Sequence, residues 1–312
     1  MKIAIFGSGA VGGYIGGRLA QAGLDVTFIA RGKHLEKILS DGLKVDSING
    51  NFTVQPAKAT RNAQSIGQTD LVFCCVKSWQ VKGAADAIRP MVGPHTVVIP
   101  IQNGVEAHIV LSEALGAEHV LPGLCRFISL VKSPGYIRHV GSDPYLAFGE
   151  IDGRKSERLE KLYHALANVD GLTVDISQNI HTALWEKFML VAPWSGLGAI
   201  TRSPVGVFRK LPETREILLK SIQEVFNVAR AHGVSVEDRA VDDTLAFLDS
   251  LPPAGTSSMQ RDINEGRPSE LNEQSGAVVR FGKTGGVKTP VNEFFYHILS
   301  PLELRARGKI TF

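Results

Sequence analysis

Short apolar runs without polar alternation mark the first half of the chain. They occupy residues 2–6, 25–30, 71–76, 96–102 and 119–124. Such runs are typical of strands that are covered on both faces, as in a parallel sheet. Between the first two runs, residues 10–22 have helical spacing and many small side chains, and Gly23 follows as a helix-ending residue. The first strand, this helix and the second strand are therefore expected to form a β–α–β unit.

The pattern changes after Ser177, where helical periods replace the strands. Before this point, residues 135–150 are expected to form a hairpin or an antiparallel extension of the sheet. Pro193 is expected to interrupt and kink the first helix of the second half, and Thr289-Pro290 opens the last helix with a threonine cap. The helices before this last one are predicted over residues 178–193, 213–232, 237–250, 257–264 and 269–283.

These patterns predict an α/β chain of two domains. Residues 1–177 would form a Rossmann domain, with a doubly wound and mostly parallel sheet, and residues 178–312 would form an all-helical domain. A length of 312 residues is enough for two separate cores. With 44% hydrophobic and 21% charged residues, the composition is that of an ordinary soluble globular protein.

The turn after the first strand reads Gly7-Ser8-Gly9-Ala10-Val11-Gly12. This glycine pattern is informative because it follows a predicted strand and opens a predicted helix. In such a turn Gly7 permits the sharp bend, Gly9 lets the backbone approach a pyrophosphate, and Gly12 allows close packing of helix on strand. The helix N-terminus then offers free N–H groups to phosphate. The sequence therefore predicts a dinucleotide-binding site made by these residues.

The end of the second strand predicts NADPH as the cofactor in preference to NADH. An NAD-binding domain places an acidic residue there, to hold the ribose 2′-hydroxyl. This chain has Arg31, and the guanidinium offers a charged, bidentate partner to a 2′-phosphate, to which Lys33 adds charge. The alternative is a solvated surface arginine that binds nothing.

Charge and cysteine content exclude several other classes. The net charge of +3, from 34 basic and 31 acidic residues dispersed along the chain, is too small to indicate nucleic acid or a membrane surface as a partner. No apolar run approaches the roughly 18 residues of a membrane span. The cysteines Cys74, Cys75 and Cys125 have no metal-binding spacing and fit a reducing compartment. We therefore expect a cytoplasmic protein without a metal site.

Further clusters carry candidate chemistry. Val76-Lys77-Ser78-Trp79-Gln80 and Gln102-Asn103-Gly104 each follow a buried strand, at the edge where open α/β sheets bind ligands. Trp185-Glu186-Lys187 places a lysine within an otherwise apolar helix. Polar residues open a later helix in Ser257-Ser258-Met259-Gln260-Arg261-Asp262, and Gly266-Arg267-Pro268-Ser269-Glu270 follows. With the glycine turn and the final Gly286-Val287-Lys288-Thr289-Pro290, the order and spacing of these clusters resemble the ketopantoate reductase family over the whole chain.

The resemblance implies a Rossmann domain joined to a helical domain, and reduction of a 2-keto acid by NADPH. By position, Lys187 resembles the catalytic lysine of the family, which also contacts substrate. An ammonium there can stabilise and protonate the oxygen that becomes negative when hydride reaches the keto carbon. Glu270 resembles the glutamate near the nicotinamide, and it would orient the lysine. Lys77 and Asn103 resemble the cofactor contacts, with Asn103 also near the substrate. From its residues alone, Lys187 could instead extend from the helix to solvent.

The substrate pocket departs from the family pattern. Ser258, with Ser257 beside it, resembles the serine that contacts the substrate carboxylate, although a helix N-cap is an alternative role for Ser258. Val191, Ser195 and Val205 stand where the family has asparagines. The resemblance therefore implies the reaction type more firmly than it implies the substrate.

The leading hypothesis is NADPH-dependent reduction of 2-dehydropantoate to pantoate, in pantothenate and coenzyme A biosynthesis. The second is reduction of another 2-keto acid on the same scaffold. The third is a non-catalytic NADPH-sensing protein, which would have no need for an acid beside the nicotinamide. The partner in the first two is a small molecule, and a homodimer through the helical domain is a further hypothesis.

Overall fold

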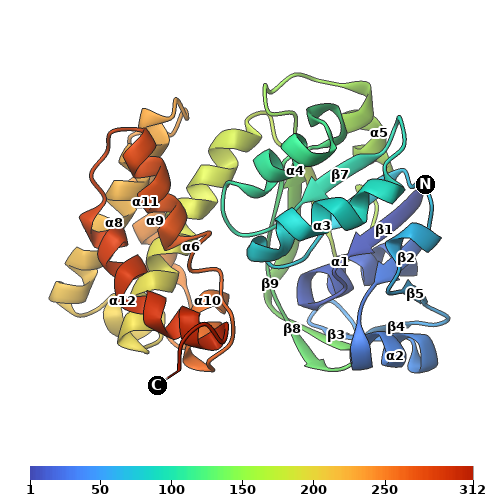
Figure 1. The fold of residues 1–312 in the computed structure, drawn as a ribbon, viewed down its shortest axis with the longest axis horizontal. Coiled ribbons are helices and arrows are strands. Elements are labelled where there is room, and N and C mark those ends of the chain that lie inside the picture. Colours follow the sequence, from blue (N-terminus) through green and yellow to red (C-terminus); the bar gives the residue numbers. More distant parts are fainter. Residues whose placement is uncertain (312) are drawn as a thin grey trace. The chain divides into compact units, whose positions relative to one another are not determined.

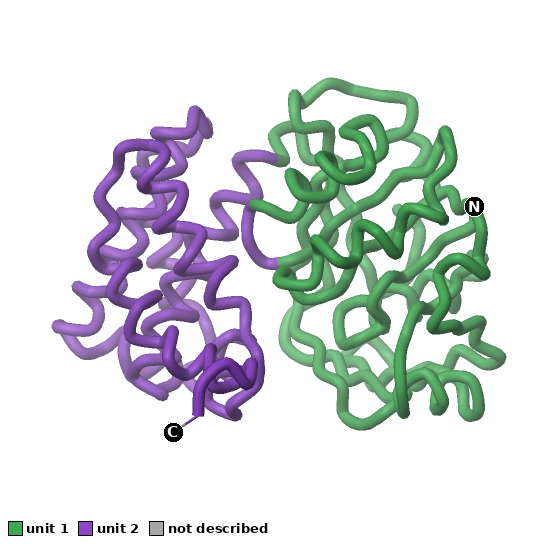
Figure 2. Tube along the Cα trace, viewed as in Figure 1, with its two compact units in different colours: residues 1–102, 106–180 green, residues 103–105, 181–312 purple. Residues whose placement is uncertain are grey.

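The computed structural model describes residues 1–311. The chain divides into two compact units, which Figure 2 shows in green and purple. Unit 1 contains residues 1–102 and 106–180, and unit 2 contains residues 103–105 and 181–312. The domain boundary expected after residue 177 stays a prediction, because compactness alone defines these units.

Unit 1 is built on a five-stranded parallel sheet in the order β5-β2-β1-β6-β7. The strands are β1 (Lys2–Phe6), β2 (Asp25–Ile29), β5 (Lys58–Thr60), β6 (Leu71–Cys74) and β7 (Val97–Pro100). From β1 the chain adds β2 and β5 on one side of the sheet, and it then returns to add β6 and β7 on the other side. The order of the strands therefore reverses between β1 and β6. Open α/β sheets bind ligands at such a switch point.

A second sheet has the order β10-β9-β3-β4, with β8 paired to β9. Its strands are β3 (Leu43–Ser47), β4 (Phe52–Val54), β8 (Gly123–Ser133), β9 (Tyr136–Phe148) and β10 (Thr173–Ile176). Residues 135–150, expected to form a hairpin or an antiparallel extension of the first sheet, contain the single strand β9 instead. The hairpin is formed by β9 with the preceding strand β8, outside the expected range, and it belongs to the second sheet. The strand expected over 119–124 is reduced to one bridge, Val98 to Val120, before β8 begins. The outer half of β8 has an exposed face, which suits an antiparallel hairpin better than a covered parallel sheet.

Helices cover the first sheet on both faces (Figure 1), which confirms the doubly wound Rossmann prediction. On one face, α1 (Ala10–Gln21) lies between the two sheets. A Cβ on Gly13 would lie 2.8 Å from Ile137 of β9, and one on Gly16 would lie 2.6 Å from Ile5 of β1. The small residues of α1 are thus explained by close packing on both sides. The other helices of unit 1 are α2 (Gly32–Asp41), α3 (Val81–Ile88), α4 (Ala107–Leu115) and α5 (Glu157–Leu166).

Unit 2 is helical throughout the part that the structure describes, and this also agrees with the prediction. Its helices are α6 (Ile180–Thr201), α7 (Val205–Phe208), α8 (Pro212–Ala231), α9 (Ala240–Ser250), α10 (Ser258–Asn264), α11 (Ser275–Thr284) and α12 (Pro290–Ala306).

Some helix ends differ from the expectation. The helix expected to stop at Pro193 continues to Thr201, because burial of the residues around the proline offsets the loss of one backbone hydrogen bond. The helix expected from 269 begins at Ser275, since the preceding turn is bound by side chains. Thr289 occupies the cap position of α12 but makes no capping bond. Glu224 of α8 caps this helix instead, accepting from the N–H groups of Val291 at 2.8 Å and Asn292 at 2.9 Å.

Candidate active site

The glycine-rich turn links β1 to α1 at the switch point of the first sheet. Gly7 has φ +99°, a value that favours glycine, and a Cβ there would lie 2.9 Å from the backbone N of Val76 after β6. A Cβ on Gly12 would collide with the carbonyl oxygen of Gly7 and would lie 2.9 Å from Ile5. A Cβ on Gly9 would meet nothing within 4 Å. Two of the three glycines are therefore required by the fold, whereas the third faces open space.

The open side of the turn is the N-terminus of α1. Gly9 is the N-cap residue and no side chain caps the helix, so the first N–H groups, from Ala10 and Val11 onward, are available to an anion. Ser8 serves the turn itself, because its hydroxyl donates to the carbonyl oxygen of Ile29 at 3.1 Å and its backbone N–H donates to the same oxygen at 3.1 Å. The side chain of Ser8 thus anchors the turn to β2.

Arg31 follows β2 at the same edge of the sheet. It is exposed and is the N-cap residue of α2, and Lys33 in the first turn of that helix is exposed as well. Since Gly7 and Ser8 both donate to Ile29 at the end of β2, these basic side chains begin within a few residues of the glycine turn. The backbone of Arg31 therefore lies two residues beyond the point at which β2 accepts from the glycine turn.

Lys77 follows β6 and lies beside the glycine turn, because its neighbour Val76 is in contact distance of Gly7. The backbone N–H of Lys77 donates to the side chain of Gln80 at 3.3 Å, which orders the short 3-10 turn Ser78–Gln80. Gln102, at the end of β7, donates through Nε2 to the carbonyl oxygens of Cys74 at 2.8 Å and Val76 at 3.0 Å. The sequence indicates Gln102 only as part of a motif, and in the structure its side chain fixes the backbone at and just after the end of β6.

Unit 2 contains Lys187 and Glu270, and both side chains are buried, at 9% and 4% exposure. Lys187 lies on α6 and Glu270 in the turn before α11. Asn103 belongs to the same unit, since a Cβ on its neighbour Gly104 would lie 3.1 Å from the carbonyl oxygen of Glu273. The structure thus brings the loop of Asn103 and the turn of Glu270 together.

Glu273 is a half-buried acid that the sequence motifs do not identify. Burial raises the pKa of its carboxyl group, and the nearby negative charge of Glu270 raises it further. Its backbone N–H donates to the carbonyl oxygen of Glu270 at 3.2 Å, within one turn. Two acids three residues apart in a polar turn were the signal that could have identified the pair.

The serines expected near the substrate open α10. Ser257 is the N-cap and accepts from the N–H of Gln260 at 3.1 Å, so the capping role considered for Ser258 belongs to Ser257. Ser258 is the first helical residue and is half-buried. Asp262 of the same motif binds Arg267, with Nη2 to Oδ1 at 2.8 Å. This ion pair closes the loop that leads towards Glu270.

The turn that carries Glu270 is fixed from α12. Ser269 donates its hydroxyl to Glu303 at 2.5 Å and its backbone N–H to the same carboxylate. Arg307 binds both partners, since it donates to Glu303 at 2.5 Å and to the carbonyl oxygen of Ser269 at 3.0 Å. Glu270 is therefore held by a rigid segment.

The positions where the sequence departs from the family lie along α6 and just beyond it. Val191 is half-buried, and Ser195 and Val205 are fully buried. The Ser195 hydroxyl and the amide oxygen of Gln260 are buried without a hydrogen-bond partner in the part of the chain that the structure describes. Gln260 packs against α6, because a Cβ on Gly198 would lie 2.6 Å from its Oε1. This region of unit 2 thus has unsatisfied polar atoms beside apolar ones.

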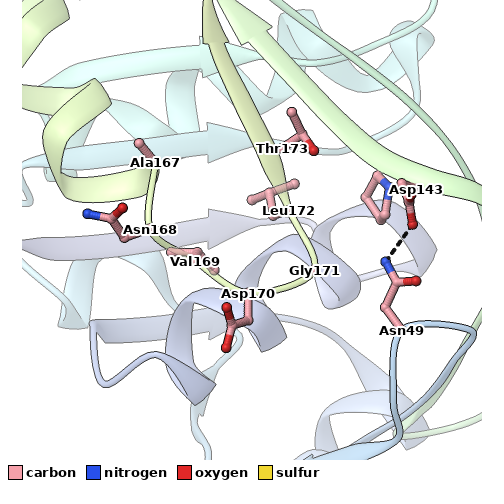
Figure 3. Close-up of a pocket in the computed structure, with 10 residues that line it drawn as sticks. Asn49, Asp143, Ala167, Asn168, Val169, Asp170, Gly171, Leu172 and Thr173 are labelled. Carbon is pink, nitrogen blue, oxygen red and sulfur yellow. Dashed lines mark hydrogen bonds between the residues drawn. The ribbon is translucent and has the colours of Figure 1, made fainter.

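The pocket in Figure 3 is separate from these residues. It has a volume of about 480 Å³ and is lined by Asn49, Asp143, Pro144 and residues 167–173. Asn49 donates to Asp143 at 3.0 Å across one side of it. Since it contains none of the predicted site residues, we assign no catalytic role to it.

Two further properties of the described residues concern the binding of a metal ion and the reactivity of a thiol. Over residues 1–311, no cluster of three or more His, Cys, Asp or Glu side chains could hold a metal ion. Burial raises the pKa of the Cys74 thiol to about 11, which keeps this thiol protonated at neutral pH. None of the helices described has the length and apolar character needed to cross a membrane.

Comparison with known proteins matches both parts of the chain to models of one family. The family model of ketopantoate reductase PanE/ApbA matches residues 3–153, and the model of its C-terminal part matches residues 179–303. The uncharacterized oxidoreductase YkpB of Bacillus subtilis is 31% identical over 97% of this chain and 99% of its own. The 2-dehydropantoate 2-reductase of a Nostoc species is 28% identical, over 99% of this chain and 98% of its own.

A solved structure agrees with these matches. The 2-dehydropantoate 2-reductase from Geobacter metallireducens superposes with a TM-score of 0.90 and 32% identity, covering 96% of this chain and 99% of the other. Together with the glycine turn at the switch point, the match over both units establishes an oxidoreductase that uses a nicotinamide cofactor. The chain belongs to the ketopantoate reductase family.

Proposed function

We propose that this protein reduces 2-dehydropantoate to pantoate with NADPH, in the cytoplasm, as a step in pantothenate and coenzyme A biosynthesis. The observation that carries the proposal is the burial of Lys187 and Glu270, two ionisable side chains, in a chain that also has an intact dinucleotide turn. Burying charged groups costs free energy, so such groups are commonly kept for function. We also propose a homodimer through the helical unit.

The residues of unit 1 fit the cofactor. The open N-terminus of α1, next to Gly9, suits the pyrophosphate, and Arg31 suits the 2′-phosphate that distinguishes NADPH from NADH. The loop of Lys77, beside Gly7, adds a positive charge at the same edge. When bound, NADPH supplies the hydride that adds to the keto carbon of the substrate.

The residues of unit 2 would handle the proton and the substrate. The ammonium of Lys187 stabilises the negative charge that develops on the keto oxygen and then donates a proton to it, so that the ketone becomes a secondary alcohol. Glu270 orients the ammonium as a carboxylate, and it relays a proton from water to the amine that is left after the transfer. Asn103 and Ser258 hold the substrate, with Ser258 on its carboxylate, while Ser257 keeps the helix capped.

The second candidate is another 2-keto acid, and the apolar side chains of Val191 and Val205 favour it. For 2-dehydropantoate, the unsatisfied Ser195 hydroxyl and Gln260 amide oxygen would have to bind the substrate hydroxyl. Oxidation of NADPH with a panel of 2-keto acids separates the candidates. Turnover with 2-dehydropantoate at least tenfold above that with every other acid supports the proposal. If the enzyme prefers a 2-keto acid that lacks the hydroxyl of 2-dehydropantoate, the proposal for 2-dehydropantoate is refuted. If it turns over none of the acids, the NADPH-sensing alternative is favoured.

Lys187→Ala tests the mechanism. Loss of general-acid catalysis lowers turnover by about 10²- to 10⁴-fold, while NADPH affinity stays within threefold, because the glycine turn is untouched. The matched control is Lys220→Ala on α8, where the side chain is 60% exposed and pairs with Glu216. Turnover above a tenth of wild type in Lys187→Ala would show that the proton comes from another group.

A further inference from the structure

The side chain of His34 joins two backbone segments on either side of the glycine-rich turn. Its Nε2 lies 2.7 Å from the carbonyl oxygen of Ser8, and its Nδ1 lies 3.0 Å from the backbone N of Gly135. Ser8 is part of the turn itself, and Gly135 lies at the tip of the β8–β9 hairpin. The imidazole therefore connects two backbone segments that lie 26 and 101 residues away from His34 along the chain.

These two contacts fix the tautomer of His34. A backbone N–H can only donate, so Nδ1 must accept from Gly135 and cannot carry a hydrogen. A carbonyl oxygen can only accept, so Nε2 must carry the hydrogen and donate to Ser8. Both ring nitrogens are thus engaged with the backbone in this arrangement, and neither is left for a ligand.

The hydrogen bond to Ser8 also orients the next N–H group. The carbonyl of Ser8 and the N–H of Gly9 belong to one planar peptide unit and point in opposite directions. Holding the oxygen towards His34 therefore turns the Gly9 N–H away from it. Gly9 is the N-cap of α1, where a phosphate would be bound.

The same side chain starts from the helix that begins with Arg31. Arg31 is the N-cap of α2, and the N–H of Leu35 donates to its carbonyl oxygen at 3.4 Å, so His34 lies in the first turn. The hairpin tip is packed tightly on α2, since a Cβ on Gly135 would lie 2.8 Å from the Cβ of Lys37. His34 thus has a fixed anchor and a fixed direction.

We infer that His34 is a positioning residue for the dinucleotide: it sets the peptide of Ser8 and Gly9 relative to Arg31, so that one cofactor meets both phosphate sites. This inference rests on the proposed NADPH site. The competing role is that of a cation that attracts phosphate directly. The two roles differ in their prediction for a neutral side chain that keeps the bond to Ser8.

Substitutions at His34 separate these roles. In His34→Gln the amide nitrogen takes a place close to that of Nε2 and can donate to Ser8, whereas in His34→Asn the amide oxygen replaces Nδ1 and keeps only the contact to Gly135. We expect His34→Ala and His34→Asn to raise the Kd for NADPH about tenfold, and His34→Gln to stay within threefold of wild type. At saturating NADPH, kcat should remain within twofold for all three variants, because the reacting groups are untouched.

The binding constants are measured by calorimetry, with melting temperatures of the free proteins as a check on folding. His95→Ala is the matched control, since this histidine of unit 1 is exposed in the loop before β7. If His34→Ala bound NADPH within threefold of wild type, or if His34→Gln bound as weakly as His34→Ala, the inference would be overturned. If the wild-type protein bound neither NADPH nor NADH, the proposed dinucleotide site would be refuted first and the inference would fall with it.

Discussion

Two glycines of the same turn are expected to respond in opposite ways to the same substitution. A Cβ on Gly9 would meet nothing within 4 Å, and its backbone angles, φ −72° and ψ −151°, are accessible to alanine. A Cβ on Gly12 would collide with the carbonyl oxygen of Gly7 and would crowd Ile5 and Cys75, each at 2.9 Å. Gly9→Ala should therefore fold normally and bind NADPH poorly, whereas Gly12→Ala should destabilise unit 1.

The magnitudes follow from these contacts. For Gly9→Ala, the lower entropy of the unfolded chain stabilises by about 0.4–1 kcal/mol and the poorer N-cap costs a similar amount, so the two nearly cancel. For Gly12→Ala, overpacking costs about 1–3 kcal/mol, and the carbonyl oxygen of Gly7 cannot move without distorting the turn. A domain of this size shifts its Tm by about 2–4 °C per kcal/mol, so the loss should be roughly 2–12 °C.

Thermal unfolding and calorimetric titration with NADPH distinguish the two variants. Gly9→Ala should melt within about 2 °C of wild type and bind NADPH at least tenfold more weakly, a change of about 1.4 kcal/mol. Unchanged binding in Gly9→Ala would show that the nucleotide does not approach this part of the turn. A Gly12→Ala variant that melted like wild type would refute the packing argument.

Three further predictions concern single side chains. Arg31→Ala should raise the Kd for NADPH by about 1.5–3 kcal/mol and leave that for NADH nearly unchanged, and a wild-type preference for NADH would contradict this assignment. Because the pKa of Glu273 is raised in the folded protein, its ionisation destabilises the fold as pH rises above the usual range of a carboxyl group. Glu273→Gln should thus raise the Tm at pH 8 and lose this advantage near pH 4; a gain independent of pH would rule out ionisation as the cause. Glu224→Ala should remove the cap of α12 and lower the Tm by several degrees relative to the exposed control Glu216→Ala, and equal Tm values would contradict the capping role.

The fold was predictable where the pattern is local. The strand at residues 2–6, the glycine turn and α1 follow one another without interruption, so spacing alone identifies them. The strands β4 and β5 were missed because each has only three residues, and pairing with β3 and β2 stabilises them. Pairing between distant segments leaves no periodic signal in so short a stretch.

The site was predictable in part for a related reason. Gly7, Gly12 and Lys77 could be identified because a motif places them at the ends of predicted strands. His34 and Gln102 act through backbone groups of distant segments, and any residue can supply a backbone group. No motif records such contacts, so only the structure reveals them.

The short segment Asn103–Val105 makes the polypeptide pass between its two compact units three times, at 102/103, 105/106 and 180/181. In unit 2 this segment lies against Glu273, close enough that a side chain on Gly104 would lie 3.1 Å from the backbone there. Cutting the chain once, after residue 180, therefore isolates neither unit intact. The fragment 181–312 lacks residues 103–105, and the fragment 1–180 keeps these residues without the unit against which they pack. For protein engineering, a chimaera with one splice point would inherit a foreign loop beside Glu270, so exchange of substrate-binding units between relatives requires three matched junctions.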